Sequence, residues 1–166
     1  MKIHLHLLFV CIFIAATKIS AQVTFESNVK VETWAGNGKP GHVDAASRLA
    51  QFDSPTALAF DDAGNLFVSD NALYPDPPEP GLNVAIRKID PSGSVPTFFR
   101  RANDYVRFNR LAFVQGTLYG LPGQASIYKI HGGDSYEDAR FGIFGDLGDM
   151  ADWGANGILV LNLRYG

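Results

Sequence analysis

Three short segments of this 166-residue sequence each occur twice, and in the same order. The paired segments are Leu58–Phe60 with Leu111–Phe113, Asn65–Val68 with Thr117–Gly120, and Ile86–Ile89 with Ile127–Ile130. Self-similarity of this kind indicates that the chain builds one small structural unit more than once, and that neighbouring units stack to bury their apolar faces. The fold must therefore be explained from the repeat.

Each copy of the repeat contains four short apolar runs that are separated by turn residues. In the first copy the runs are Thr56–Phe60, Leu66–Ser69, Val84–Ile89 and Val95–Phe99, and in the second they are Arg110–Val114, Thr117–Leu121, Ser126–Ile130 and Arg140–Phe144. Short runs joined by tight turns, such as Asp61–Asn65 with its Gly64, predict antiparallel strands and hairpins. Four-stranded sheets that recur every 40 to 50 residues or so (about one blade length) are typical of a β-propeller, so we predict an all-β fold.

The first copy also resembles the NHL repeat. The matching segments are a T-x-A-G start at Thr33–Gly36, a G-x-x-D loop at Gly41–Asp44, a hairpin at Ala63–Asp70 and the I-R-K-I strand at Ile86–Ile89. The second copy is weaker, because it lacks the proline before the first strand and the aspartate after the second. The resemblance extends from Val31 to about Asp152 and implies a partial β-propeller made of four-stranded antiparallel blades. It implies little about activity, since a fold of this type serves many functions.

The resemblance further implies how the domain at 22–166 is divided. The expected parts are an outer strand at 29–35, a blade at 56–99 with a proline-rich insertion at 71–84, a blade at 110–144, and the start of a further blade at 157–163. A propeller ring needs about 4 to 8 blades, so we expect this chain to be a fragment of a larger propeller. The alternative is that several copies self-associate through unpaired blade edges.

The first 21 residues have the layout of a secretory signal peptide. Lys2 precedes a mostly apolar run at Ile3–Ala16, and a more polar stretch follows that ends in the small residue Ala21. An apolar run this short does not span the roughly 30 Å of a bilayer core, so cleavage after Ala21 is predicted and no membrane span is expected afterwards. We therefore expect a secreted or periplasmic protein. Cleavage would also remove Cys11, the only cysteine, and with it thiol chemistry and disulfides.

Charge and spacing argue against two classes of ligand. The formal net charge is only −3, so a nucleic-acid partner is not expected. The segment Gly36–Gly41 has the G-x-G-x-x-G spacing of a dinucleotide-binding loop. Pro40 interrupts that segment, however, and a similar glycine-rich segment returns at Gly145–Asp149. We therefore interpret it as a blade loop.

Several polar residues receive ordinary structural interpretations at this stage. Arg87 and Lys88 are expected to face solvent, on a strand whose isoleucines pack in the core. His42 and His131 are interpreted as surface residues of unrelated loops. Trp34 is expected to pack between neighbouring sheets.

Two groups of residues are the candidates for a metal site. The first is Asp70 with Asn71, at the end of the second run; the resemblance implies that metal-binding acids and amides gather near the central channel in six-bladed enzymes of lactonase or lyase type. The second is an expected acidic loop with Asp146, Asp149 and Asp152, which has oxygen ligands suited to Ca²⁺ but lacks the spacing of an EF-hand. The competing interpretation is that all five are ordinary turn residues. No cofactor is therefore expected, and Ca²⁺ is the alternative.

The function expected from these features is that of a binding or interaction scaffold for a protein or carbohydrate partner. The insertion loop Asn71 to Val84 is the expected contact site, because it is the most individual segment of the sequence. No catalytic residue is assigned, since neither a G-x-S-x-G nor an H-E-x-x-H motif is present. The alternative is a part of a six-bladed propeller enzyme, a metal-dependent hydrolase or lyase that is inactive in this form.

Overall fold

The computed structural model describes residues 30–71, 84–101, 106–122, 126–139, 146–152, 154 and 157–163. The chain falls into two compact units, Met1–Val31 and Glu32–Gly166, and all the strands belong to the second. The predicted signal peptide at 1–21 and the interior of the insertion, 72–83, lie outside the described residues. In the part that is described, no helix is long and apolar enough to cross a membrane.

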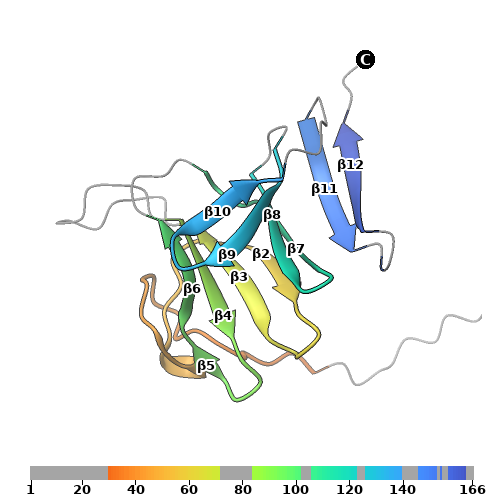
Figure 1. Cartoon of the computed structure of the whole chain (residues 1–166). Helices are drawn as coiled ribbons and strands as arrows, with labels where there is room; N and C mark the ends of the chain where they lie inside the picture. Colours follow the sequence, from red (N-terminus) through yellow and green to blue (C-terminus); the bar gives the residue numbers. More distant parts are fainter. Residues whose placement is uncertain are drawn as a thin grey trace, which may run out of the picture. The chain divides into compact units, whose positions relative to one another are not determined.

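The first sheet contains the four strands of the first copy of the repeat, all antiparallel, in the order β2-β3-β4-β6 (Figure 1). These strands are β2 (Pro55–Phe60), β3 (Leu66–Asn71), β4 (Val84–Ile89) and β6 (Thr97–Arg101). The turn between β2 and β3 is closed by Asp61, whose Oδ1 accepts the backbone N–H groups of Ala63 and Asn65, while Gly64 adopts a φ of 80°. The predicted hairpin is therefore confirmed.

The second sheet contains the second copy, in the order β10-β9-β8-β7. Its strands are β7 (Arg110–Val114), β8 (Thr117–Leu121), β9 (Tyr128–Gly132) and β10 (Ser135–Asp138). The fourth strand was predicted too late in the chain, at 140–144, a range outside the described residues. The reason is the Gly132-Gly133 pair, whose φ angles of 86° and 64° turn the chain back directly after β9.

A further hairpin follows, in which β11 (Asp146–Asp152) pairs with β12 (Ile158–Leu163). The inner strand of the third sheet was predicted at 157–163, but β11 is the strand that lies against β7, so that range is the second strand of the hairpin (Figure 1). Gly154 and Gly157 have φ angles of 59° and 103°, and the Gly157 N–H donates to the Gly154 oxygen. This turn separates two strands as Asp61–Asn65 does in the first sheet.

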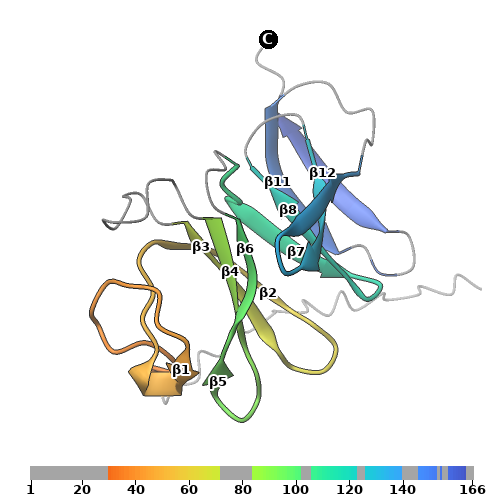
Figure 2. The same ribbon diagram turned by 60° about the vertical axis from the view of Figure 1, so that its left-hand side comes forward.

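The segment before the first sheet is a loop. Of the predicted outer strand at 29–35, the described residues 30–35 form no strand. After them, the backbone N–H groups of Gly36 and Asn37 donate to the oxygens of Ser47 and Ala50. The loop then forms β1 (Ala45–Ala46), which pairs with β5 (Ser94–Val95), and a 3₁₀ turn at Ser47–Leu49 (Figure 2).

The two four-stranded sheets and the β11–β12 hairpin, which is the start of a third sheet, stack face to face in chain order. We call the face of a sheet that is directed toward the preceding sheet its leading face, and the opposite one its trailing face. Buried side chains of the first sheet's trailing face and the second sheet's leading face form one core: Phe67, Val84, Ile86, Phe99, Phe108, Leu111, Leu118 and Ile130. The second sheet's trailing face packs on Met150, Ile158 and Val160 of the hairpin. The repeat is thus a four-stranded antiparallel sheet that buries apolar residues on both faces.

Candidate functional site

Asp70, the first metal candidate, is fully buried at the end of β3. Its Oδ1 accepts the backbone N–H groups of Asp53 (2.9 Å) and Ser54 (2.8 Å). A buried carboxylate is costly unless such partners are present. The carboxylate therefore fastens the segment that enters β2 to the leading face of the first sheet.

Arg87 lies beside Asp70 and is also fully buried, which corrects the expectation that it faces solvent. Its guanidinium donates to four oxygens: the backbone oxygens of Gln51 (2.8 Å), Val43 (3.0 Å) and Val95 (3.3 Å), and Oδ1 of Asp44 (2.6 Å). It also lies 3.9 Å from Asp70 Oδ2 and 5.1 Å from the centre of the Phe52 ring. The cause of the burial is the loop at 41–53, which folds over β4 and presents its carbonyl groups to the guanidinium.

Asp44 completes this arrangement from the loop side. Its carboxylate accepts the N–H and the hydroxyl of Thr97, both at 2.8 Å, in addition to Arg87. Burial by itself raises the pKa of Asp44, but the hydrogen bonds from Thr97 and the charge of Arg87 outweigh it and hold the pKa below its ordinary value. The carboxylate is therefore charged in the folded protein.

His42 also belongs to this cluster, which corrects the interpretation of it as a surface residue. Its Nδ1 lies 3.2 Å from Asp70 Oδ2, and its side chain is only 24% exposed. Neither of these two atoms has a hydrogen bond of good geometry. We refer to Asp44, Asp70, Arg87 and His42 together as the loop-fastening cluster, because all four join the loop at 41–54 to the first sheet.

Asn71 belongs to a different contact, although it is adjacent to Asp70. Consecutive side chains of a strand project to opposite faces, so Asn71 lies on the trailing face. Its amide donates to Thr56 Oγ1 (2.6 Å) and to the backbone oxygen of Phe108 (3.2 Å). The structure therefore does not bring Asp70 and Asn71 together as a pair of ligands.

The acidic residues of the second metal candidate lie on β11, which corrects the expectation that they form a loop. Asp149 accepts the N–H of Met150 and lies 3.2 Å from Arg110 Nε. Asp152 accepts the N–H of Gly154. Asp149 and Asp152 occupy register positions on opposite faces of the hairpin, and the side chain of Asp146 is outside the described part.

The arrangement of these side chains does not favour binding of a metal ion. Among the described residues, no three His, Cys, Asp or Glu side chains are grouped so that they could hold a metal ion. In the loop-fastening cluster the guanidinium of Arg87 already supplies the positive charge that the two carboxylates require. A divalent cation beside Asp70 would have to overcome repulsion from that fixed charge.

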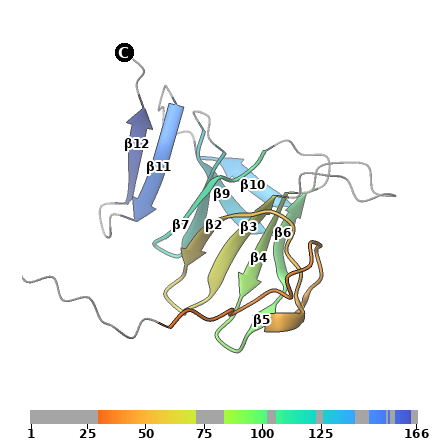
Figure 3. The ribbon, with the colours of Figure 1, turned by 180° about the vertical axis from the view of Figure 1, so that it is seen from behind.

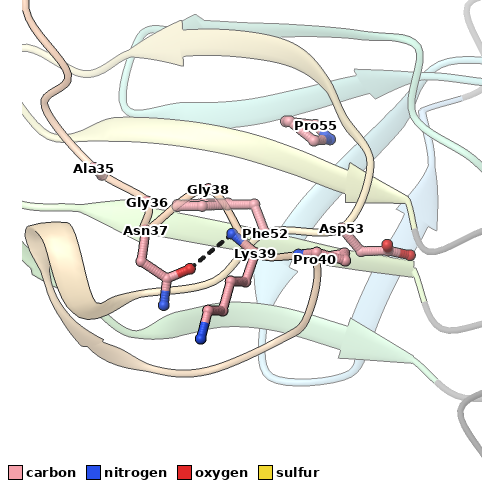
Figure 4. A pocket seen from close by; sticks show the side chains of 9 residues that line it. All are labelled: Ala35, Gly36, Asn37, Gly38, Lys39, Pro40, Phe52, Asp53 and Pro55. Atoms are coloured by element: carbon pink, nitrogen blue, oxygen red, sulfur yellow. Dashed lines mark hydrogen bonds between the residues drawn. The ribbon is translucent and has the colours of Figure 1, made fainter.

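Most of the glycine-rich segment, Gly36 to Pro40, lines a pocket of about 400 Å³ together with Ala35, Phe52, Asp53 and Pro55 (Figure 4). Asn37 Oδ1 accepts the Lys39 N–H within it. The segment leads into β1 and a 3₁₀ turn of three residues, so it lacks the helix N-terminus on which dinucleotide phosphates rest. The interpretation as a structural loop agrees with this geometry. The insertion between Asn71 and Val84 lies outside the described residues, except for these two ends, which pair with each other.

The leading face of the first sheet carries an exposed apolar surface over β2. Leu58 is 62% exposed, Phe60 is 59% exposed, and Trp34 stacks on Phe60 with ring centroids 6.2 Å apart. We call these three residues the apolar ridge. The loop at 41–54 covers β3 and β4 but leaves the ridge exposed to solvent.

Comparison with known proteins supplies no further guide to function. No family model matches the chain, and no curated protein is significantly similar to it.

Proposed function

We propose that this chain is a secreted interaction module built of NHL-type propeller blades, and that the apolar ridge is its binding surface. One observation carries the proposal. The repeat positions of Leu58 and Phe60 are occupied in the second sheet by Leu111, which is 7% exposed, and by Phe113, which stacks on Phe67 at 5.8 Å. The same positions are thus covered by a sheet in one repeat and open in the other.

The propeller assignment is supported by the order of the sheets. Each begins with a hairpin, and successive sheets meet through inner strands, β2 against β7 and β7 against β11 (Figure 3). Blades of a propeller are arranged in this way around a channel. The signal-peptide layout of residues 1–21 supports export.

The chemistry of the ridge favours a protein partner over a carbohydrate. Leu58 is aliphatic, and the Trp34 and Phe60 rings lie against each other with an interplanar angle of 17°. Contiguous exposed apolar surface on a soluble protein commonly marks a protein contact. A sugar platform would instead need an open aromatic face with polar groups around it.

Cross-linking at the ridge tests the proposal. A photoreactive benzoylphenylalanine at position 60 should give adducts with a protein in the medium of producing cells, and the same group at position 49 should not. Leu49 is the matched control because it is 69% exposed but lies on the 3₁₀ turn. If position 60 gives no protein adduct, the ridge is not a binding surface.

The second candidate is a metal-dependent hydrolase or lyase of which this chain forms a part. It is favoured by two of the four buried polar atoms that lack a hydrogen bond of good geometry among the described residues, His42 Nδ1 and Asp70 Oδ2, which lie 3.2 Å apart. Calorimetric titration with Ca²⁺ and Zn²⁺ separates the candidates: the interaction module should show no saturable binding. Stoichiometric binding that disappears in Asp70→Asn would establish the metal site and support the enzyme.

A further inference from the structure

Two sheet-to-sheet interfaces lie within the described residues, and in each the first strands of consecutive sheets are in contact, β2 with β7 and β7 with β11. The first sheet's trailing face covers Leu111 and Phe113, and the second sheet's trailing face covers Met150 and Val160. One leading face and one trailing face have no sheet against them among the described residues, although the loop at 41–54 covers β3 and β4 on that leading face. They lie at opposite ends of the stack, on the first sheet and on the hairpin β11–β12.

The two kinds of face also differ in the size of their side chains. In β2 and β7 the alanine of the L-A-F phrase, Ala59 or Ala112, lies on the trailing face and packs in the adjoining core. The leucine and phenylalanine of the phrase lie on the leading face. Bulky residues therefore meet a surface that contains small ones, which is how packed layers interdigitate.

The open trailing face of the hairpin has a small residue at the corresponding place. Met150 packs on the second sheet, so Ala151, the next residue of β11, lies on the other face, and it is exposed. The open leading face has Leu58 and Phe60. The difference in side-chain size seen at the buried interfaces therefore recurs between the two ends, and Asp149, which shares the face of Ala151, is paired with Arg110 of the second sheet.

We infer that a second copy of this chain seats the trailing face of its β11–β12 hairpin on the apolar ridge. The inference rests on the proposed function and names the partner. It continues the interface that the chain already makes twice. Because the two faces are different patches, the contact is head-to-tail, and it produces a ring or an open stack rather than a symmetric dimer.

Sedimentation velocity on the full chain is the first test. The wild-type chain should associate as its concentration rises, and Leu58→Asp with Phe60→Asp should weaken association by at least about tenfold, because a charge at the centre of an apolar contact is strongly unfavourable. Leu49→Asp should associate like the wild type. A wild-type chain that is monomeric at every concentration would overturn the inference, as would equal weakening by Leu49→Asp.

Cysteine cross-linking tests the head-to-tail geometry. In a Cys11→Ser background each introduced cysteine is the only thiol. A mixture of Phe60→Cys and Ala151→Cys chains, treated with a short bis-maleimide, should give the mixed dimer, whereas Leu49→Cys with Ala151→Cys should not. Dimers of Phe60→Cys alone, in place of the mixed dimer, would show a symmetric contact and contradict the inference.

The outcomes also separate this inference from the proposed function. If position 60 is photo-cross-linked to another protein and the chain is monomeric, the interaction module stands and the second copy is the wrong partner. If position 60 forms no adduct of any kind, both proposals fail.

Discussion

The first and second sheets are copies of one repeat, but different elements cover their leading faces. In the second sheet the leading face is covered by another sheet, and Tyr128 stands at the repeat position of Arg87 and packs edge-on against Phe108 and Tyr136. In the first sheet a loop covers β3 and β4, and Arg87 satisfies the loop's carbonyl groups. The comparison teaches that the covering element decides whether a repeat position is aromatic or charged.

The largest predicted effect concerns this one position. Arg87→Ala should lower the free energy of unfolding by about 3 to 5 kcal/mol, because it leaves Asp70 buried without its charge partner and the loop carbonyls without a donor. Tyr128→Phe, which removes only the polar group at the equivalent position of the second sheet, should cost less than about 1 kcal/mol, since it keeps the ring. Urea unfolding measures both, and equal effects would contradict the distinction between the two covers.

A smaller loss of stability is expected at Gly120, where the second sheet leaves no room for a side chain. Gly120 stands at the repeat position of Val68, and a Cβ there would lie 2.8 Å from Ile130 Cδ1 and would also clash with the Phe108 ring. Gly120→Ala should therefore destabilise the fold by about 1 to 3 kcal/mol through overpacking. Phe108→Leu in the same chain should recover part of the loss if the ring is the obstacle, and strict additivity of the two changes would exclude that explanation.

The smallest effect is a difference in acid sensitivity. Three aspartates of the first-sheet region have a lowered pKa: the Thr97 bonds and Arg87 outweigh burial at Asp44, Asn65 outweighs burial at Asp61, and the Ser92 hydroxyl with the Ser94 N–H lowers the pKa of Asp90. A carboxyl group whose pKa is lower in the folded than in the unfolded state raises the free energy of unfolding as long as it is ionised. That stabilisation is complete above the ordinary value of 3.8 and is lost as the pH falls below it.

Hydrogen exchange between pH 7 and pH 3 measures this difference. Amides of β1 and the loop at 41–54 should lose protection before those of β7 and β8, and Asp44→Asn should make the loss less dependent on pH. Earlier loss in the second sheet would show that these aspartates do not control acid stability.

The sequence predicted the strands that alternate and end in clear turns. β2, β3, β4, β7 and β8 lie within two residues of the predicted runs, because each presents apolar residues to a packed face. β10 was missed since its sequence S-Y-E-D is mostly polar, with only Tyr136 packed on the core. β11 was predicted as a loop because its aspartates and Gly148 are typical of turns. Among its described side chains, Met150 is the buried one.

The candidate site was less predictable, because it depends on contacts between distant segments. Arg87 is separated in sequence from its partners Asp44 and Gln51 by 43 and 36 residues, so no local sequence pattern predicts its burial. Asp70 could be singled out from the sequence, but its carboxylate accepts hydrogen bonds from the loop backbone at Asp53 and Ser54 instead of forming a metal site with Asn71. The exposed ridge could not be predicted, since the same L-A-F phrase is buried in one sheet and open in the other.

The most direct test of this account compares the two leucines of that phrase at two protein concentrations. Leu111→Ala should lower the free energy of unfolding by about 2 to 5 kcal/mol at both concentrations, because it empties a buried site. Leu58→Ala should cost less than about 0.5 kcal/mol in dilute solution, as exposed positions do. It should also abolish the rise in unfolding midpoint that we expect of the wild-type chain at high concentration. A wild-type midpoint that is independent of concentration, with Leu58→Ala as damaging as Leu111→Ala, would contradict the account.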